Sequence, residues 1–264
     1  MIVRLALAVL VLAAAPSAAG ALELQPYRAV YDLSLAKARQ GSGIIGLHGL
    51  LVLEWAEACD GYKLEQRMGF RITRAQSGEM LSDIQVETLE SKDGTQFRFS
   101  VRSSIDDHVV DEIVGHASLE GPGKGGIATF KKPGGKVLEL PPGTIFPTEH
   151  TRVLVERALA GEQRVVRTVF EGSNVDTPYQ AVAFLGSVGD RETGAAPHDL
   201  LAGLRSWPVQ VAYFPLGSAD EAPEYEVGFR IFSNGISDRL VLDYGDFTVS
   251  GSLTRLEALA GSGC

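Results

Sequence analysis

Residues 44–76, IIGLHGLLVLEWAEACDGYKLEQRMGFRITRAQ, contain the pattern that decides the fold. Residues 44–56 form a long apolar run of the kind found in buried strands. After it, apolar side chains share one parity at Tyr62, Leu64, Met68, Phe70 and Ile72, with Gln66 as the single polar residue in that series. That period is typical of a strand with one buried face, and the Asp60-Gly61 pair between the two runs is a hairpin signal. The stretch therefore predicts two long antiparallel strands joined by a tight turn.

The same alternation continues on both sides of this hairpin. Towards the N-terminus, Tyr27, Tyr31 and Leu35 share one parity. Towards the C-terminus, turn signals such as Asn234-Gly235 recur about every ten residues, which is the spacing of a β-meander. The pattern predicts about 14 strands in all. The later ones are expected near residues 80–90, 97–101, 109–119, 127–131, 136–140, 163–171, 178–188, 207–215, 224–233, 236–244 and 246–257.

One clear helix interrupts the strands. The periodicity predicts it over about residues 147–160, with Pro147 at its start and an apolar side that includes Val153 and Leu154. Thr148 is the expected N-cap, and Gly161 is the expected C-terminal stop. A second, short helix is expected around residues 198–204.

The order of these elements defines the fold class. Strands and helices do not alternate, so a parallel α/β sheet is not expected. An open sheet of this size would leave long edges, and curling towards closure avoids them. We therefore predict a mostly β protein, a single domain over residues 22–264, in which a large antiparallel sheet curls into a broken barrel with one main helix.

The first 21 residues have the order of a secretory signal peptide. Arg4 provides a basic start, residues 5–15 are apolar, and Ala19-Gly20-Ala21 is a small-residue cleavage site. We expect cleavage before Leu22, with sites after Ala18 or Ala19 as alternatives. The apolar run is shorter than the roughly 20 residues that span a bilayer. The protein is therefore expected to be exported to the periplasm and to be soluble, not an integral membrane protein.

The charge of the chain excludes one class of partner. The 264 residues carry a formal net charge of −9, with 24 basic and 33 acidic side chains. Without Arg4 the balance is 23 to 33, or −10. An acidic protein has no electrostatic attraction to nucleic acid and little to an anionic membrane surface. Acidity is also an ordinary means of staying soluble.

The two cysteines predict one structural disulfide. Cys59 lies in the first hairpin turn, Cys264 is the last residue, and 204 residues separate them. An even cysteine count in an exported chain favours a bridge. Neither a Cys-x-x-Cys motif nor a nearby base supports a redox role instead.

Motifs for catalysis, cofactors or metals are weak. Gly41-Ser-Gly-Ile-Ile-Gly46 matches the dinucleotide-binding pattern, but a β-rich run follows it where a helix is required, so we expect a turn. His108 and His116 lie near Asp106, Asp107, Asp111 and Glu112, which suggests an acidic, solvent-exposed strand edge more than a metal site. His150 falls in the first helical turn, where a neutral, hydrogen-bonded imidazole is expected. We expect no cofactor, no metal and no enzymatic activity.

Several segments together resemble the cell envelope integrity proteins called EipB. They are Tyr27–Leu35, Trp55 with Cys59-Asp-Gly-Tyr62, Leu140–His150 with its helix, Phe170–Ser173, Trp207-Pro-Val209, Pro223–Glu226, Leu242–Phe247 and Cys264. Of these, Phe146-Pro147-Thr148-x-His150 and the placement of the two cysteines are the most specific. One departure is Arg28, where the family leads us to expect histidine.

The resemblance implies a spiral-like broken barrel, a Cys59–Cys264 disulfide and a periplasmic role in envelope maintenance, in a protein that leans towards a monomer. It offers no catalytic residues, and Phe146, Pro147, Thr148 and His150 are predicted to form a structural or interaction motif. We expect other envelope proteins or envelope components as partners. One alternative is a module that carries a lipid or a lipoprotein acyl chain inside the curled sheet. A less favoured one is a hydrolase that uses His150 or the acidic cluster.

Overall fold

The computed structural model describes residues 22–188 and 198–261. Its strands form one sheet, accompanied by helix α1 (Pro147–Leu159) and a short 3-10 helix, η1 (Asp199–Leu201). The strands are β1 (Tyr27–Ala38), β2 (Ile44–Glu57), β3 (Gly61–Arg74), β4 (Gly78–Ser91), β5 (Gln96–Ile105), β6 (His108–Leu119), β7 (Gly126–Lys132), β8 (Val137–Leu140), β9 (Thr144–Ile145), β10 (Arg164–Val169), β11 (Tyr179–Leu185), β12 (Ser206–Pro215), β13 (Tyr225–Phe232), β14 (Ser237–Asp243) and β15 (Phe247–Ala258).

The sheet has 15 strands in the order β8-β7-β6-β5-β4-β3-β2-β1-β15-β14-β13-β12-β11-β10-β9. Strands that follow one another in the chain are neighbours in the sheet, except β8 and β9, which form its two edges. In addition, β1 pairs with β15, which joins the first strand to the last. All pairs are antiparallel but one, β9 with β10. We call β1–β8 the first limb and β9–β15 the second limb.

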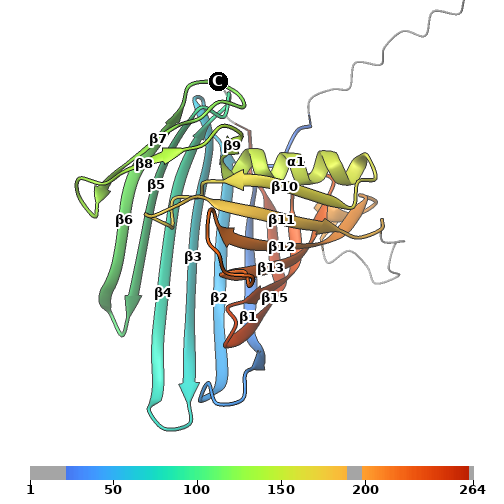
Figure 1. Cartoon of the computed structure of the whole chain (residues 1–264). Helices are drawn as coiled ribbons and strands as arrows, with labels where there is room; N and C mark the ends of the chain where they lie inside the picture. Colours follow the sequence, from blue (N-terminus) through green and yellow to red (C-terminus); the bar gives the residue numbers. More distant parts are fainter. Residues whose placement is uncertain (1–21, 189–197, 262–264) are drawn as a thin grey trace, which may run out of the picture.

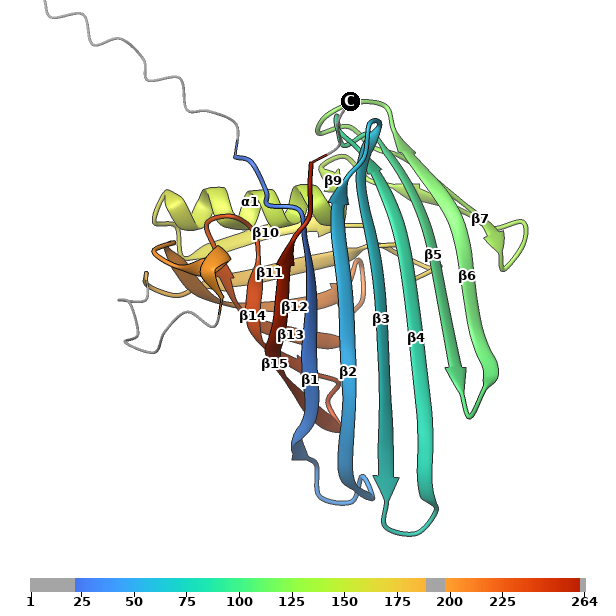
Figure 2. The same ribbon diagram turned by 180° about the vertical axis from the view of Figure 1, so that it is seen from behind.

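The two limbs cross instead of continuing in one plane. The long strands of the first limb run lengthwise, and the shorter strands β10–β13 run across them (Figures 1 and 2). The sheet's outermost strands, β8 and β9, are consecutive in the chain and are joined by residues 141–143 only. The broken barrel is thus closed at this corner by the chain itself, and the predicted fold class is confirmed.

A cluster of phenylalanines forms where the second limb returns to the first. Phe97 and Phe99 on β5 meet Phe146 and Phe170, with ring centroids 4.9 Å apart for Phe97–Phe146 and 5.4 Å apart for Phe99–Phe170. Gly172 follows in the left-handed region at φ +81°, and a Cβ there would lie 2.5 Å from the Phe99 ring. The close approach of this loop to β5 therefore requires glycine.

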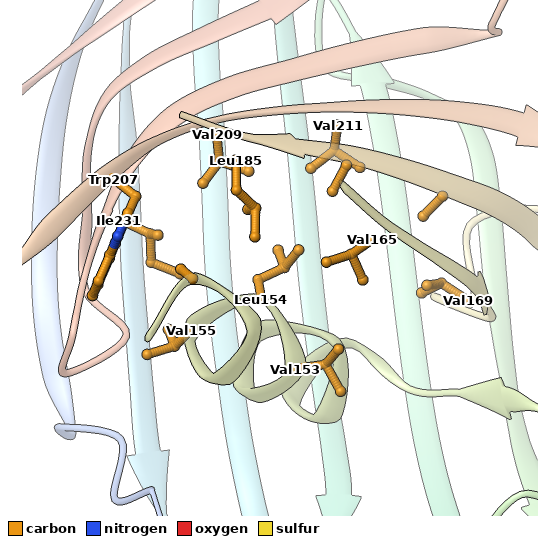
Figure 3. Packing of buried hydrophobic residues seen from close by; sticks show 13 residues of the cluster. Val153, Leu154, Val155, Val165, Val169, Leu185, Trp207, Val209, Val211 and Ile231 are labelled. Carbon is orange, nitrogen blue, oxygen red and sulfur yellow. The ribbon is translucent and has the colours of Figure 1, made fainter. Parts of the chain in front are cut away.

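A second cluster lies under α1. The helix places Val153, Leu154 and Val155 against apolar side chains of β10–β13, among them Trp207 and Ile231 (Figure 3). This face explains the apolar periodicity of the helix, because those side chains are removed from water only when α1 packs inside the curve of the second limb.

The element predictions mostly hold. Helix α1 ends within a residue of expectation, and Gly161 follows it at φ +78°. A 3-10 turn occupies part of the predicted short helix. The segment around Gly41 and Gly43 is a turn that leads into β2, so the dinucleotide-binding pattern is accounted for by a hairpin connection.

Candidate functional site at the start of helix α1

The candidate site is the junction where α1 begins between the two limbs, and it contains the predicted motif of Phe146, Pro147, Thr148 and His150. Phe146, not Thr148, is the N-cap residue, with an extended backbone at φ −98° and ψ 170°. The prediction of Thr148 as N-cap is therefore wrong. The Phe146 ring is buried against Phe97, which places Pro147 in the first turn of the helix and carries Thr148 inside it.

A carboxylate from another strand caps the helix instead. Glu90, on β4, accepts hydrogen bonds from the backbone N–H of Thr148 at 2.7 Å and from that of Glu149 at 3.1 Å. Its side chain belongs to a residue only 3% exposed. A negative charge is favoured at a helix N-terminus, where free N–H groups point outward. Sequence reasoning missed Glu90 because it lies 58 residues before Thr148 and looks like any polar residue of an alternating strand.

Burial makes Glu90 an unusual acid. Loss of water around the carboxylate raises its pKa from the usual 4.5 to about 7, although the hydrogen bonds from Thr148 and Glu149 act in the opposite direction. The group that holds α1 to the first limb thus changes its charge near neutral pH.

His150 lies in the same first turn of α1 and is also buried, at 5% exposure. Burial, assisted by the positive charge of Arg167, lowers its pKa from 6.5 to about 4. The imidazole is therefore neutral at neutral pH, whereas, within the described part of the chain, the predicted hydrogen bond is missing at one of its two nitrogens. Its Nε2 atom has no hydrogen-bond partner among the residues that the structure describes. The hydrolase hypothesis made His150 its main candidate, and the ring is enclosed by protein instead of facing solvent.

Arg152 ties the same helix to two segments of the first half of the chain. Its guanidinium donates to the backbone oxygen of Leu22 at 2.9 Å and to the Tyr62 hydroxyl at 3.2 Å. The Gln25 N–H donates to the Asn234 oxygen at 2.9 Å. Residues 22–26, which we call the N-terminal strap, are therefore fixed between α1 and the turn before β14.

An apolar pocket of about 180 Å³ lies beneath these ties. Its wall comes from both limbs, from α1 and from the strap, so that residues far apart in the sequence line one space. Its lining includes Tyr27, Leu53, Trp55, Leu64, Leu154 and Phe229. Sequence reasoning expected an apolar interior but could not place a cavity in it.

The other predicted sites lie elsewhere. His108, Asp111 and His116 are exposed on β6, and no group of three or more metal-binding side chains occurs in residues 22–188 and 198–261. Cys59 lies at the β2–β3 turn, whereas Cys264 lies outside the described residues, so their pairing stays a prediction. A Cβ atom on Gly261 would lie 3.7 Å from the Glu57 carboxylate, which brings the end of the described chain near Cys59.

Comparison with known proteins shows the family. A family model described as EipB-like matches residues 18–260. The chain belongs to the EipB-like family. A relative from Brucella abortus, named cell envelope integrity protein EipB, is 37% identical over 251 residues, which are 93% of this chain and 88% of that protein.

A solved structure supports the same assignment. It is the crystal structure of a β-barrel-like protein of a domain of unknown function, DUF1849, from Brucella abortus. The two chains align with a TM-score of 0.82 and 33% identity, over 91% of this chain and all of the other. This family member thus has the barrel-like architecture of its relative. None of the described helices has the length and apolarity that a membrane span requires.

Proposed function

We propose that this chain is an exported, non-enzymatic protein that supports the integrity of the cell envelope from the periplasm. The observation that carries the proposal is the 37% identity, over nearly the whole chain, to a protein named for that role. Two features of the sequence are in keeping with it, the signal-like residues 1–21 and the pair of cysteines suited to an oxidising compartment.

The junction favours binding over catalysis. Its two buried ionisable groups are engaged in the structure, Glu90 as the cap of α1 and His150 as an enclosed neutral ring. A general base must reach the proton that it abstracts, and neither group faces a cleft. We therefore expect the protein to act through contacts with envelope proteins or envelope components.

The pocket favours a lipid over a protein among those components, because its lining is mainly apolar and aromatic. The acidic surface of the chain leaves nucleic acid out of the proposal. The proposed active form is a monomer, as the resemblance to the EipB family implies.

The test is a deletion strain challenged with detergent and with a cell-wall antibiotic. The full chain should restore growth under both stresses, and a chain lacking residues 2–21 should not, because it stays in the cytoplasm. Growth of the deletion strain equal to that of the parent under both stresses would contradict the envelope role.

The same strain tests whether the role is non-enzymatic. His150→Gln removes the imidazole that the hydrolase alternative needs and keeps a polar side chain of similar length. Rescue by this variant supports a binding role. Loss of rescue by a variant that is folded and present at normal level would favour catalysis.

A further inference from the structure

The interior of the curled sheet is unevenly filled. Along β1 and β2, the inward side chains of Tyr31, Leu33 and Leu47 are buried in a continuous apolar cluster. Nearer to α1, inward side chains on the same strands, Leu53 and Trp55, are only half-buried and line the pocket. The pocket is therefore a gap between two apolar clusters, the one under α1 and the one along β1 and β2.

Several polar groups around this space have partners within the protein. Thr151 donates to the Pro147 oxygen, Gln25 to the Pro26 oxygen, and Asn234 to the Leu200 oxygen. The Ser237 oxygen accepts from the Tyr31 hydroxyl. These groups require no polar contact from a ligand, and most of the lining is apolar or aromatic, so the wall favours an apolar occupant.

The size of the pocket limits that occupant. A comparable apolar cavity of about 150 Å³ holds a benzene molecule, so 180 Å³ holds on the order of eight carbon atoms. That is too small for a whole lipid and suits the end of one unbranched chain. Trp55, which stacks on Tyr62 at 5.2 Å, gives the wall a flat apolar surface.

We propose that this pocket binds the terminal part of a single acyl chain, with the N-terminal strap as its movable cover. Leu24 and Gln25 of the strap line the pocket, and Leu24 also packs on Gly235. The strap is held by the contacts of Arg152 and Asn234, whereas the remaining wall consists of strands, α1 and the turn between β13 and β14. Opening therefore requires displacement of a short segment, and the sheet can stay intact. The inference rests on the proposed function, for which it specifies the class of envelope component.

The test measures binding of straight-chain fatty acids of increasing length to the purified mature chain by titration calorimetry and native mass spectrometry. Each methylene that enters the pocket should tighten binding about fourfold, until about eight carbons are buried and the gain ends. Absence of saturable binding at every length would overturn the inference, as would binding that is independent of chain length.

Two variants of neighbouring residues locate the site. Leu53→Trp places an indole in the pocket and should weaken binding about tenfold or more, because the chain and the ring compete for one space. Val52→Trp adds the same ring to the outer face of β2, where Val52 is 39% exposed, and should leave binding unchanged. If Leu53→Trp does not fold, Thr88→Leu fills the pocket from β4 with a smaller side chain. Equal binding by wild type and a folded filling variant would overturn the site.

The role of the strap is tested by the dissociation rate of a bound fatty acid. Leu24→Ala should raise the rate at which a bound chain dissociates, because it removes part of the cover, while Leu216→Ala, outside the pocket, should not. Failure of this inference can be told from failure of the proposed function. If Leu53→Trp rescues the deletion strain, the envelope role does not depend on acyl-chain binding in the pocket, and the envelope role itself is unaffected. If the protein binds fatty acids saturably but its deletion has no phenotype, the envelope role fails and acyl-chain binding stands.

Discussion

The two ends of strands β1 and β2 are built from the same sequence pattern and held in different ways. At the end remote from α1, which we call the packed end, Tyr31 pairs with Leu51, and both side chains are buried with Leu33 and Leu47. At the end near α1, the tied end, Tyr27 pairs with Trp55 beside the pocket. The ties there are the Glu90 cap and the Arg152 contacts.

The difference shows that alternation in a strand determines which face points inward, but the elements that pack on that face determine how deeply each residue is buried. β14 and β15 supply Leu242 and Val249 to the packed end. The helix that covers the tied end begins at a polar junction and leaves a cavity beneath it. Packing therefore buries the inward side chains of β1 and β2 at the packed end, whereas at the tied end a few specific bonds hold α1 and the strap over them.

The largest expected effect is loss of the predicted bridge at the tied end. Cys59→Ser should lower the free energy of unfolding by up to about 5 kcal/mol, because the bridge closes a loop of 204 residues and restricts the unfolded chain. Thermal unfolding with and without reductant measures it. The Cys59→Ser/Cys264→Ser double variant is the control and should be no less stable than either single variant. Unchanged melting of protein shown to be reduced would contradict the bridge.

Matched truncations compare the two ends directly. Leu47→Ala, at a fully buried position of the packed end, should cost about 3–4 kcal/mol, because it removes packed methyl groups and leaves a cavity. Leu53→Ala, on the same strand at the pocket, should cost about 1 kcal/mol, because its side chain is only half-buried. Urea unfolding of the two variants provides the measurement. Equal losses would show that the pocket is filled in solution.

Next in size is a pH-dependent change at Glu90. Folded Glu90 keeps its proton up to about pH 7, whereas the unfolded chain releases it near 4.5. The contribution of Glu90 to the free energy of unfolding is therefore complete below pH 4.5. It is lost as the pH rises towards 7, by about 3 kcal/mol at most. Glu90→Gln removes this titration. The stability of wild type relative to the variant should decline over that window in urea unfolding.

The controls for Glu90 come from its own strand and from His150. Glu87→Gln, exposed on β4, removes a carboxylate outside the junction. The folded-state pKa of His150 is lowered. Its contribution to the free energy of unfolding is therefore full above pH 6.5 and is lost as the pH falls towards 4. His150→Gln should thus change the pH profile in the direction opposite to Glu90→Gln. The same direction for both would show that one of the two groups is not buried in solution.

Local sequence patterns predict the strands and the helix but not the contacts between the limbs. Strands, turns and α1 were expected from local patterns, because hairpins join neighbours and the 3.6-residue period is visible in residues 147–160. The wrong N-cap and the missed Glu90 have one cause, since a cap supplied by β4 has no local signal near α1. The pocket was also invisible, because it is lined by segments that only the crossing of the limbs brings together.

Another small effect separates local from global stability at the tied end. Arg152→Met keeps the aliphatic stem and removes the two hydrogen bonds to Leu22 and Tyr62. It should cost about 1–2 kcal/mol, since the Arg152 side chain is only 20% exposed. The loss should appear first in the strap as faster hydrogen exchange of the Gln25 amide, which donates to Asn234. Arg157→Met, at an exposed position of the same helix, is the control and should leave that amide unchanged. If exchange at Gln25 and in the core of β2 speeds up equally in Arg152→Met, the strap does not open separately from the sheet, and the tied end unfolds only with the whole barrel.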